Sequence, residues 1–303
     1  MEKIETFVPG HLTGLFEICN GSTILKTGSV GAGLSIKYGV KTRIEVKESD
    51  ENKIKIYFND KIIENAKVSK YVVDYYLKTI QLPKYEIKVI HQIDFPVGCG
   101  FGASGAGALG VSYGLNVLLN TQFTKIKCGQ IAHIAEVVNK TGLGDVIAQT
   151  YGGVEIRKKP GAPGIGVLDN ILYRPNLKIV CYTNGKIDTA SIIGDKKHKE
   201  VIKKVGNKLI RNVINNPSID SLMRTAYQFA LETELMSEDI KELLENLHSA
   251  GYKNSSMIML GNSIFCIVEK EKADIVADLI KSNTNNGIIF ITDIDNEGAR
   301  IIG

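Results

Sequence analysis

A glycine-rich stretch near the middle of the chain is the feature that most restricts how it can fold. Residues 98–107 read Gly-Cys-Gly-Phe-Gly-Ala-Ser-Gly-Ala-Gly, after an alternating segment at 85–93 and at the start of an apolar segment at 103–119. Alternation is typical of a strand, and a segment that is apolar nearly all round is typical of a buried helix. Small residues let the backbone approach a ligand, and a helix start offers unpaired N–H groups and partial positive charge. The stretch therefore indicates an anion site, most often for phosphate. The alternative is a turn followed by a small-residue helix against which another helix packs closely.

Three better-known loops do not fit this stretch. The spacing of Gly100, Gly102 and Gly105 matches the dinucleotide pattern, but no acidic residue follows about twenty positions later to hold a ribose. The chain has no Gly-Lys-Ser or Gly-Lys-Thr, which excludes a P-loop. Residues 102–106 read Gly-Ala-Ser-Gly-Ala, so the last glycine of a hydrolase nucleophile elbow is missing.

Composition limits the class of protein. A chain of 303 residues, 44% hydrophobic and 23% charged, is typical of a folded protein with two domains or one large one. The 37 Lys and Arg and 33 Asp and Glu are spread along the sequence, which argues against a nucleic-acid surface. The five cysteines have no metal-type spacing, the N-terminus lacks an apolar signal core, and no apolar run could cross a bilayer. We expect a cytoplasmic protein with free thiols, no nucleic-acid or membrane partner and no structural zinc; a homodimer is left open.

Hydrophobic patterning predicts two regions. The expected elements of the first are strands at 43–47, 53–58, 85–93 and 153–157, a helix at 103–119, and a helix through 131–138 that ends at Gly142. Those of the second are strands at 177–182, 256–260, 263–269 and 287–292, and helices at 196–215, 218–235, 238–250 and 272–282. Residues 159–164, Lys-Pro-Gly-Ala-Pro-Gly, are typical of a linker or hairpin. We therefore expect an α+β protein with domains at 1–172 and 173–303.

The glycine-rich stretch and its flanks resemble the second motif of the GHMP kinases. That motif reads Pro-x-x-x-Gly-Leu-Gly-Ser-Ser; here residues 96–104 have Phe101 for the Leu and Ala103 for the first Ser. Residues 8–17 resemble the first motif, with His11 where Lys or Arg is common. Residues 255–262 take the place of the third motif but lack its glycine run, so phosphate contacts are less expected there.

Segments 28–33, 141–145 and 259–262 add to these motifs and point within the family to the archaeal branch that phosphorylates pantoate. The resemblance runs from about residue 4 to 270. It implies a ribosomal protein S5 domain 2-like N-terminal domain, a ferredoxin-like C-terminal domain, and a cleft between them for ATP and the acceptor. It also implies Mg²⁺-dependent phosphorylation of the 4-hydroxyl of pantoate in archaeal coenzyme A synthesis. Two alternatives remain: a related kinase acting on homoserine, shikimate or mevalonate, and a non-catalytic sensor of a nucleotide or anion.

The resemblance assigns roles at the phosphate end of the site. Ser104 at the helix start and Glu136 are expected to hold Mg²⁺, and Asp145 is expected to accept or orient the proton of the attacking hydroxyl. Their alternative roles are a helix cap for Ser104, a solvated helix residue for Glu136 and a helix cap for Asp145. The expected nucleotide contacts are Pro96, Gly98, Gly100, Phe101, Gly102, Ala103, Ser104 and Gly105.

Four positions are expected to line the acceptor pocket. They are Ser29, His133, Arg157 and Thr189. A guanidinium can hold a carboxylate with two parallel hydrogen bonds, which makes Arg157 the candidate for the acid group of the substrate. The alternatives are a turn residue, a surface histidine, a surface ion pair and a helix cap, respectively.

Overall fold

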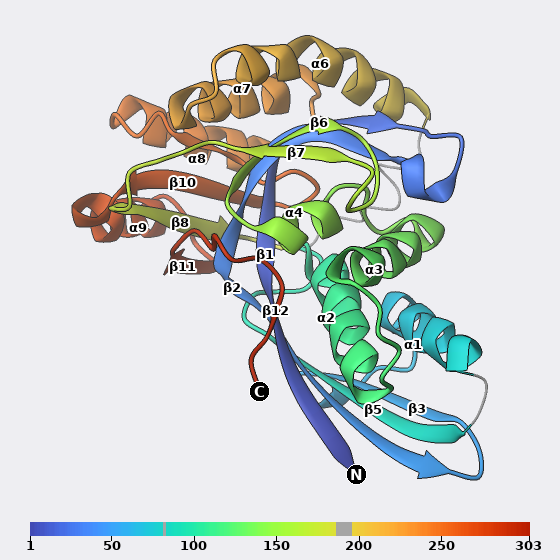
Figure 1. Ribbon diagram of the computed structural model, residues 1–303. Helices are drawn as coiled ribbons and strands as arrows, with labels where there is room; N and C mark the ends of the chain where they lie inside the picture. The colour runs from blue at the N-terminus through green and yellow to red at the C-terminus, as the bar shows by residue number, and fades with distance from the viewer. Residues whose placement is uncertain (81–82, 186–195) are drawn as a thin grey trace.

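The computed structural model describes residues 1–80, 83–185 and 196–303 and contains two β-sheets with helices packed against them (Figure 1). The first sheet has the strand order β12-β1-β2-β5-β3-β4, with β6 paired to β2 and β7 paired to β6. Its strands are β1 (Glu2–Cys19), β2 (Gly28–Ser49), β3 (Lys53–Phe58), β4 (Lys61–Ile62), β5 (Lys84–Ile93), β6 (Val154–Lys159), β7 (Val167–Asn170) and β12 (Arg300–Ile301). All these pairs are antiparallel except β3 with β5.

The helices of this half lie along the first sheet. They are α1 (Lys67–Ile80), α2 (Ala103–Leu118), α3 (Lys125–Asn139) and the short α4 (Asp145–Tyr151). Helices α1, α2 and α3 pack side by side (Figure 1), and α2 also contacts β1 and β2. Glycines of α2 make this close approach possible, because a Cβ at Gly110 would lie 2.8 Å from Thr42 Oγ1. The small residues of α2 therefore have a packing role against the sheet, whereas the alternative left by the sequence was close packing against another helix.

The second sheet has the order β11-β8-β10-β9 and is antiparallel throughout. Its strands are β8 (Leu177–Thr183), β9 (Ser255–Met257), β10 (Ser263–Glu269) and β11 (Ile288–Thr292). Its helices are α6 (Lys196–Asn215), α7 (Ile219–Glu232), α8 (Glu238–Ser249) and α9 (Ala273–Ser282). Single 3-10 turns occur at Ile24–Lys26 and Lys270–Lys272. Helices α6 and α7 also pack on β1, so the long first strand joins the two halves.

The α+β class is confirmed, but several elements differ from the prediction. Strands β1 and β2 are 18 and 22 residues long, and of the two only 43–47 was predicted. Helices α1 and α4 and strand β7 were not predicted. Helix α3 ends at Asn139 rather than at Gly142, because Lys140 adopts a left-handed conformation with φ 57°. The strand predicted at 256–260 ends at Met257, where the chain turns back into β10.

The end of the chain returns to the first half of the molecule. Strand β12 pairs with β1 at Thr6 and Phe7, while the second sheet begins at Leu177. The domain boundary near residue 172 stays a prediction. Within the described residues, no helix has the length and apolar character needed to span a membrane.

Candidate functional site

The glycine-rich stretch forms a turn that leads directly into α2. Gly98, Gly100 and Gly102 have φ values of 86°, 90° and 69°, a region that favours glycine. The first intrahelical bond joins the Ala106 amide to the Gly102 carbonyl at 3.1 Å. The amides of 103–105 precede this bond, so the helix start presents them together with its partial positive charge. This geometry suits an anion.

A cavity of about 340 Å³ lies over this turn. It is lined by Thr13, Phe16, Ser29, Val97, Gly98, Gly100, Phe101, Gly102, Ala103, Ser104, Lys140, Thr141, Gly142, Leu143, Gly144, Asp145, Arg157, Met259 and Leu260. The turn between β9 and β10 covers the glycine-rich turn, and Ser263 Oγ donates to the Cys99 carbonyl at 2.8 Å. The structure therefore brings segments from the first, second and third motifs to one cavity of a size typical for small-molecule sites.

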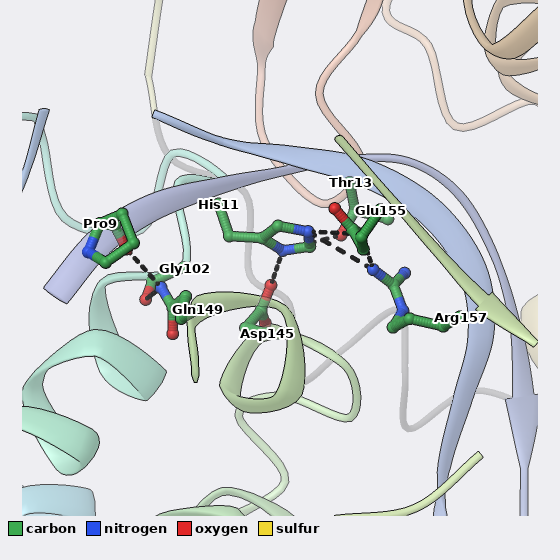
Figure 2. Close-up of polar contacts among 8 residues, drawn as sticks. All are labelled: Pro9, His11, Thr13, Gly102, Asp145, Gln149, Glu155 and Arg157. Atoms are coloured by element: carbon green, nitrogen blue, oxygen red, sulfur yellow. Dashed lines mark hydrogen bonds and ion pairs between the residues drawn. The ribbon is translucent and has the colours of Figure 1, made fainter. Parts of the chain in front are cut away.

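Asp145, the first residue of α4, is held by a histidine of β1 (Figure 2). His11 Nδ1 lies 2.7 Å from Asp145 Oδ1, and His11 Nε2 lies 2.9 Å from Glu155 Oε1. His11 is fully buried, whereas 23% of the Asp145 side chain is exposed. Because both ring nitrogens face carboxylate oxygens, both donate, and the ring is an imidazolium.

The electrostatics of this pair follow from its surroundings. Burial alone would lower the pKa of His11, but the charges and hydrogen bonds of Glu155 and Asp145 raise it to about 9. Burial alone would raise the pKa of Asp145, but the His11 hydrogen bond and the charges of His11 and Arg157 lower it. Asp145 is therefore an ionised carboxylate at neutral pH and can accept a hydrogen bond from a hydroxyl in the cavity.

Arg157 lies on β6, on the same face as Glu155. Its Nη1 donates to Glu155 Oε1 and lies 3.4 Å from His11 Nε2. The side chain is 1% exposed, and its Nε has no hydrogen-bond partner among the described residues. A Cβ at Gly144 would lie 2.9 Å from this Nε and would overlap the Ser29 hydroxyl. A buried N–H without a partner is costly, so Nε and Ser29 together indicate a place for an acceptor group of a ligand.

Glycines of β2 make room for these charged side chains. In the pairing of β2 with β6, Gly31 lies opposite Arg157 and Gly33 opposite Glu155. A Cβ at Gly31 would lie 2.7 Å from Arg157 Nη2, and one at Gly33 would lie 3.1 Å from Glu155 Oε1. The small residues of segment 28–33 are therefore explained by sterics, because larger side chains there would crowd Arg157 and Glu155.

Glu136 of α3 is buried behind Thr141 and Gly142, which line the cavity, and does not line it itself. Its Oε1 accepts a hydrogen bond from Thr141 Oγ1 at 2.6 Å, whereas its buried Oε2 has no partner among the described residues. A Cβ at Gly142 would overlap this Oε2 and lie 2.9 Å from Asp145 Oδ2, so the two carboxylates converge on that glycine. Burial raises the pKa of Glu136 to about 7, the charge of Asp145 acts in the same direction, and the Thr141 and Ser104 hydroxyls oppose it.

These oxygen atoms are the type of ligand that Mg²⁺ prefers. In the part of the chain that the structure describes, no three His, Cys, Asp or Glu side chains gather as a metal site. An ion beside Glu136 and Ser104 would therefore need further oxygens from a bound phosphate or from water. The unpartnered Oε2 fits such an ion, because a buried carboxylate oxygen is stabilised by a cation.

A second cavity, of about 290 Å³, adjoins the first. The two share Val97, Ala103, Ser104 and Thr141. Its other walls are Val40, Phe58, Asn65, Ala66, Lys67, Val68, Ser69, His91, Ile93, Gly107 and Asn139. His91 is bonded to Thr42 and Ser69, and burial lowers its pKa to about 3, so it is neutral. A mostly apolar cavity beside an anion site suits a flat ring attached to a phosphate.

Five of the predicted site residues lie outside the two cavity linings or outside the described residues, and the first is Glu136, which is buried behind Thr141 and Gly142. His133 does not line either cavity, and it is not a surface residue; its Nε2 lies 2.9 Å from the Thr27 carbonyl and its side chain is buried. Neither Pro96 nor Gly105 is in the cavity lining. Thr189 lies outside the residues that the structure describes.

Three residues of the site were missed at the level of sequence. They are His11, Glu155 and Gln149, whose Nε2 donates to the carbonyls of Pro9 at 3.0 Å and Gly102 at 2.9 Å (Figure 2). Glu155 precedes Arg157 by two positions, which places both on one face of a strand. Gln149 follows Asp145 by four positions, which places both on one face of a helix. These two spacings could have indicated Glu155 and Gln149.

Comparison with known proteins identifies relatives of this chain. The family described as "GHMP kinases N terminal domain" matches residues 66–153. The pantoate kinase of Methanocaldococcus jannaschii is 38% identical over 276 residues, covering 91% of this chain and 97% of that protein. The pantoate kinase of Thermococcus kodakarensis is 34% identical, covering 91% of each. A solved structure described as a phosphotransferase related to the CoA biosynthesis pathway is 32% identical, with a TM-score of 0.89 and coverage of 99% of this chain and 98% of that one.

Proposed function

The chain belongs to the GHMP kinase family, and on this premise we propose that it transfers the terminal phosphoryl group of ATP to the 4-hydroxyl of pantoate. The products are 4-phosphopantoate and ADP, and the reaction is a step of coenzyme A biosynthesis. The relatives named above support this substrate. The observation that carries the proposal is the buried Arg157, whose Nε has no partner among the described residues, on the same cavity as an ionised Asp145.

The nucleotide occupies the phosphate end of the site. Its base lies in the second cavity, beside Val97 and Ala103, and its phosphates lie on the amides at the start of α2. Glu136 and Ser104 would hold Mg²⁺ against these phosphates, where the ion neutralises their negative charge. The shared wall of the two cavities supports this continuous path from base to phosphate.

Asp145 acts on the acceptor hydroxyl. His11 fixes one oxygen of this carboxylate, and Oδ2 is directed toward Gly142 and Glu136. Because the pKa of Asp145 is lowered, the group is ionised at neutral pH and can orient the hydroxyl and receive its proton. The rest of the rate enhancement comes from positioning and charge neutralisation.

The acid group of the substrate binds at Arg157 and Ser29. Arg157 Nε and the Ser29 hydroxyl can both donate to one carboxylate, on the other side of Gly144 from the phosphates. This division separates the acid that is recognised from the hydroxyl that reacts. The five cysteines are free, which supports a reducing cytoplasm as the place of the reaction.

A coupled ADP-release assay tests the proposal. Wild-type protein with ATP and Mg²⁺ is given pantoate, homoserine, shikimate or mevalonate in turn, and the initial rate of ADP formation is measured. We expect pantoate to give the highest kcat/KM. A higher value with another alcohol would assign the chain to that substrate, and ADP release that no acceptor stimulates would favour a nucleotide sensor.

A further inference from the structure

Glu155 lies at the centre of a buried row of four charged groups that alternate in sign. Its Oε1 faces both His11 Nε2, at 2.9 Å, and Arg157 Nη1. Glu155 is fully buried, and it does not line either of the two cavities that form the site. The carboxylate therefore contacts two residues of the site and lies outside the cavities itself.

We propose that Glu155 is a positioning residue that fixes Arg157 and, through His11, Asp145 in a single arrangement, so that recognition of the acid group and activation of the hydroxyl depend on one carboxylate oxygen. This proposal rests on the proposed function. One oxygen that accepts from two cations sets the distance between them, since neither can move without losing its bond. The link runs from Arg157 at the acid end of the cavity to Asp145 at the hydroxyl.

Charge balance explains why this position needs an acid. The charged groups that face His11 are Asp145 of α4 and Glu155 and Arg157 of β6. With His11 protonated, the four formal charges sum to zero, and three of the four side chains (His11, Glu155 and Arg157) are at most 1% exposed. Buried charges must be paired or else change protonation. Loss of the Glu155 charge would leave one excess positive charge, and His11 is the cation that can release its proton.

Glu155 also keeps Arg157 away from Asp145. The guanidinium is close enough for its charge to lower the pKa of Asp145, but its Nη1 is bonded to Glu155. Without Glu155, the remaining anion nearby is Asp145, and a direct ion pair would occupy the carboxylate that must receive the hydroxyl. The Glu155 carboxylate therefore leaves Arg157 Nε for the substrate and leaves Asp145 for the reaction.

The test is Glu155→Gln, which keeps the size of the side chain and removes its charge. We expect the pantoate KM to rise at least tenfold, kcat to fall at least tenfold and the ATP KM to change less than twofold. The alkaline limb of the kcat profile should move down by at least one pH unit, because His11 loses its proton more easily. Glu45→Gln is the matched control; Glu45 also pairs with cations on the first sheet but lies away from the site.

A second readout does not depend on activity. The NMR titration of the His11 ring, assigned with His11→Gln among the five histidines, should show its pKa lowered by at least one unit in Glu155→Gln. An unmoved His11 titration together with an unmoved pantoate KM would overturn the inference. Wild-type protein that releases no ADP with pantoate would instead overturn the proposed function, and the titration would still decide the role of Glu155.

Glu155→Asp covers the case in which the glutamine variant does not fold. This variant keeps the negative charge but is one methylene too short to reach both partners. We expect the His11 titration to stay within half a unit of wild type while the pantoate KM rises at least fivefold. An aspartate variant with wild-type pantoate KM would show that Glu155 is not a positioning residue.

Discussion

The loop at 141–145 has an acid end, where the substrate carboxylate is proposed to bind, and a phosphate end, where Mg²⁺ and the phosphates are proposed to bind. The two ends differ in how their charges are balanced. At the acid end, beside Gly144, Arg157 is paired with Glu155, and His11 lies between two carboxylates. At the phosphate end, beside Gly142, burial raises the pKa of Glu136 to about 7, and its Oε2 has no partner in the part of the chain that the structure describes. The acid end is charge-balanced before any ligand binds, whereas the Glu136 carboxylate at the phosphate end faces no cationic side chain among its hydrogen bonds and fits the proposed Mg²⁺. Substitutions at the two ends should therefore affect different ligands.

Asp145 belongs to both ends, so its loss should have the largest effect. We expect Asp145→Asn to lower kcat by roughly 10²–10⁴, the range for a positioned proton acceptor, and to leave nucleotide affinity nearly unchanged. Turnover measured with saturating pantoate and calorimetric titration of ATP check this. Asp169→Asn is the control, because Asp169 is an exposed residue of β7 that pairs with Lys158 of β6. A folded Asp145→Asn with near-normal turnover would contradict the role of Asp145.

Arg157→Lys isolates the acid end. The charge is kept, but a lysine cannot donate from both the Nε and Nη1 positions, so the pantoate KM should rise at least tenfold. The ATP KM should barely change, because the proposed phosphate site is at the amides that start α2. Two titrations, one with each substrate, measure this, with Arg43→Lys on the surface as the control. Equal increases in both constants would mean that Arg157 supports the fold and does not bind the acid.

Glu136→Gln and Ser104→Ala isolate the phosphate end. Each removes an oxygen ligand or its charge, so the Mg²⁺ concentration for half-maximal rate should rise severalfold in each variant. The pantoate KM measured at saturating Mg²⁺ should stay within twofold of wild type. If Mg²⁺ titrations of both variants match wild type, neither Ser104 nor Glu136 holds the ion.

The smallest of these effects concerns His11 at the acid end, because its protonation should make the stability of the folded protein depend on pH. The pKa of His11 is raised from its ordinary 6.5 to about 9 in the folded protein. Its protonation therefore stabilises the fold fully below pH 6.5, and this stabilisation is lost as the pH rises through 9. The melting temperature of wild type should fall by several degrees between pH 6.5 and 9.5, more steeply than that of His11→Gln. Parallel curves in calorimetry would show that His11 does not carry this charge.

The fold class and the phosphate turn could be predicted because they depend on local patterns. The strand before residue 96, the glycines and the buried helix after them are visible within about thirty residues of sequence. The long strands β1 and β2 were mostly missed, because residues 6–18 of β1 are almost entirely buried on both faces and do not alternate. Their partners, α6 and α7, are distant in sequence.

The parts of the site that were missed depend on contacts between distant segments. His133 was expected at the acceptor pocket, but only the structure shows that it bonds the Thr27 carbonyl, 106 residues away in sequence. In the sequence, Glu155 is an ordinary strand residue. Only the pairing of β6 with β2, in which Glu155 lies opposite Gly33, brings its carboxylate to His11. Local spacing predicts which side chains share a face, whereas pairing across the sheet decides which charges meet.

Two glycine variants of the loop at 141–145, each titrated with Mg²⁺ and with pantoate, test most directly whether this loop separates a phosphate end from an acid end. The Cβ of Gly142→Ala would overlap Glu136 Oε2 and also lie 2.9 Å from Asp145 Oδ2, whereas that of Gly144→Ala would overlap the Ser29 hydroxyl and lie 2.9 Å from Arg157 Nε. The half-maximal Mg²⁺ concentration and the pantoate KM are measured for both variants and for wild type. We predict that Gly142→Ala raises mainly the Mg²⁺ requirement and Gly144→Ala mainly the pantoate KM, each at least fivefold. The same change in both constants for both variants would contradict the division of the site into an acid end and a phosphate end.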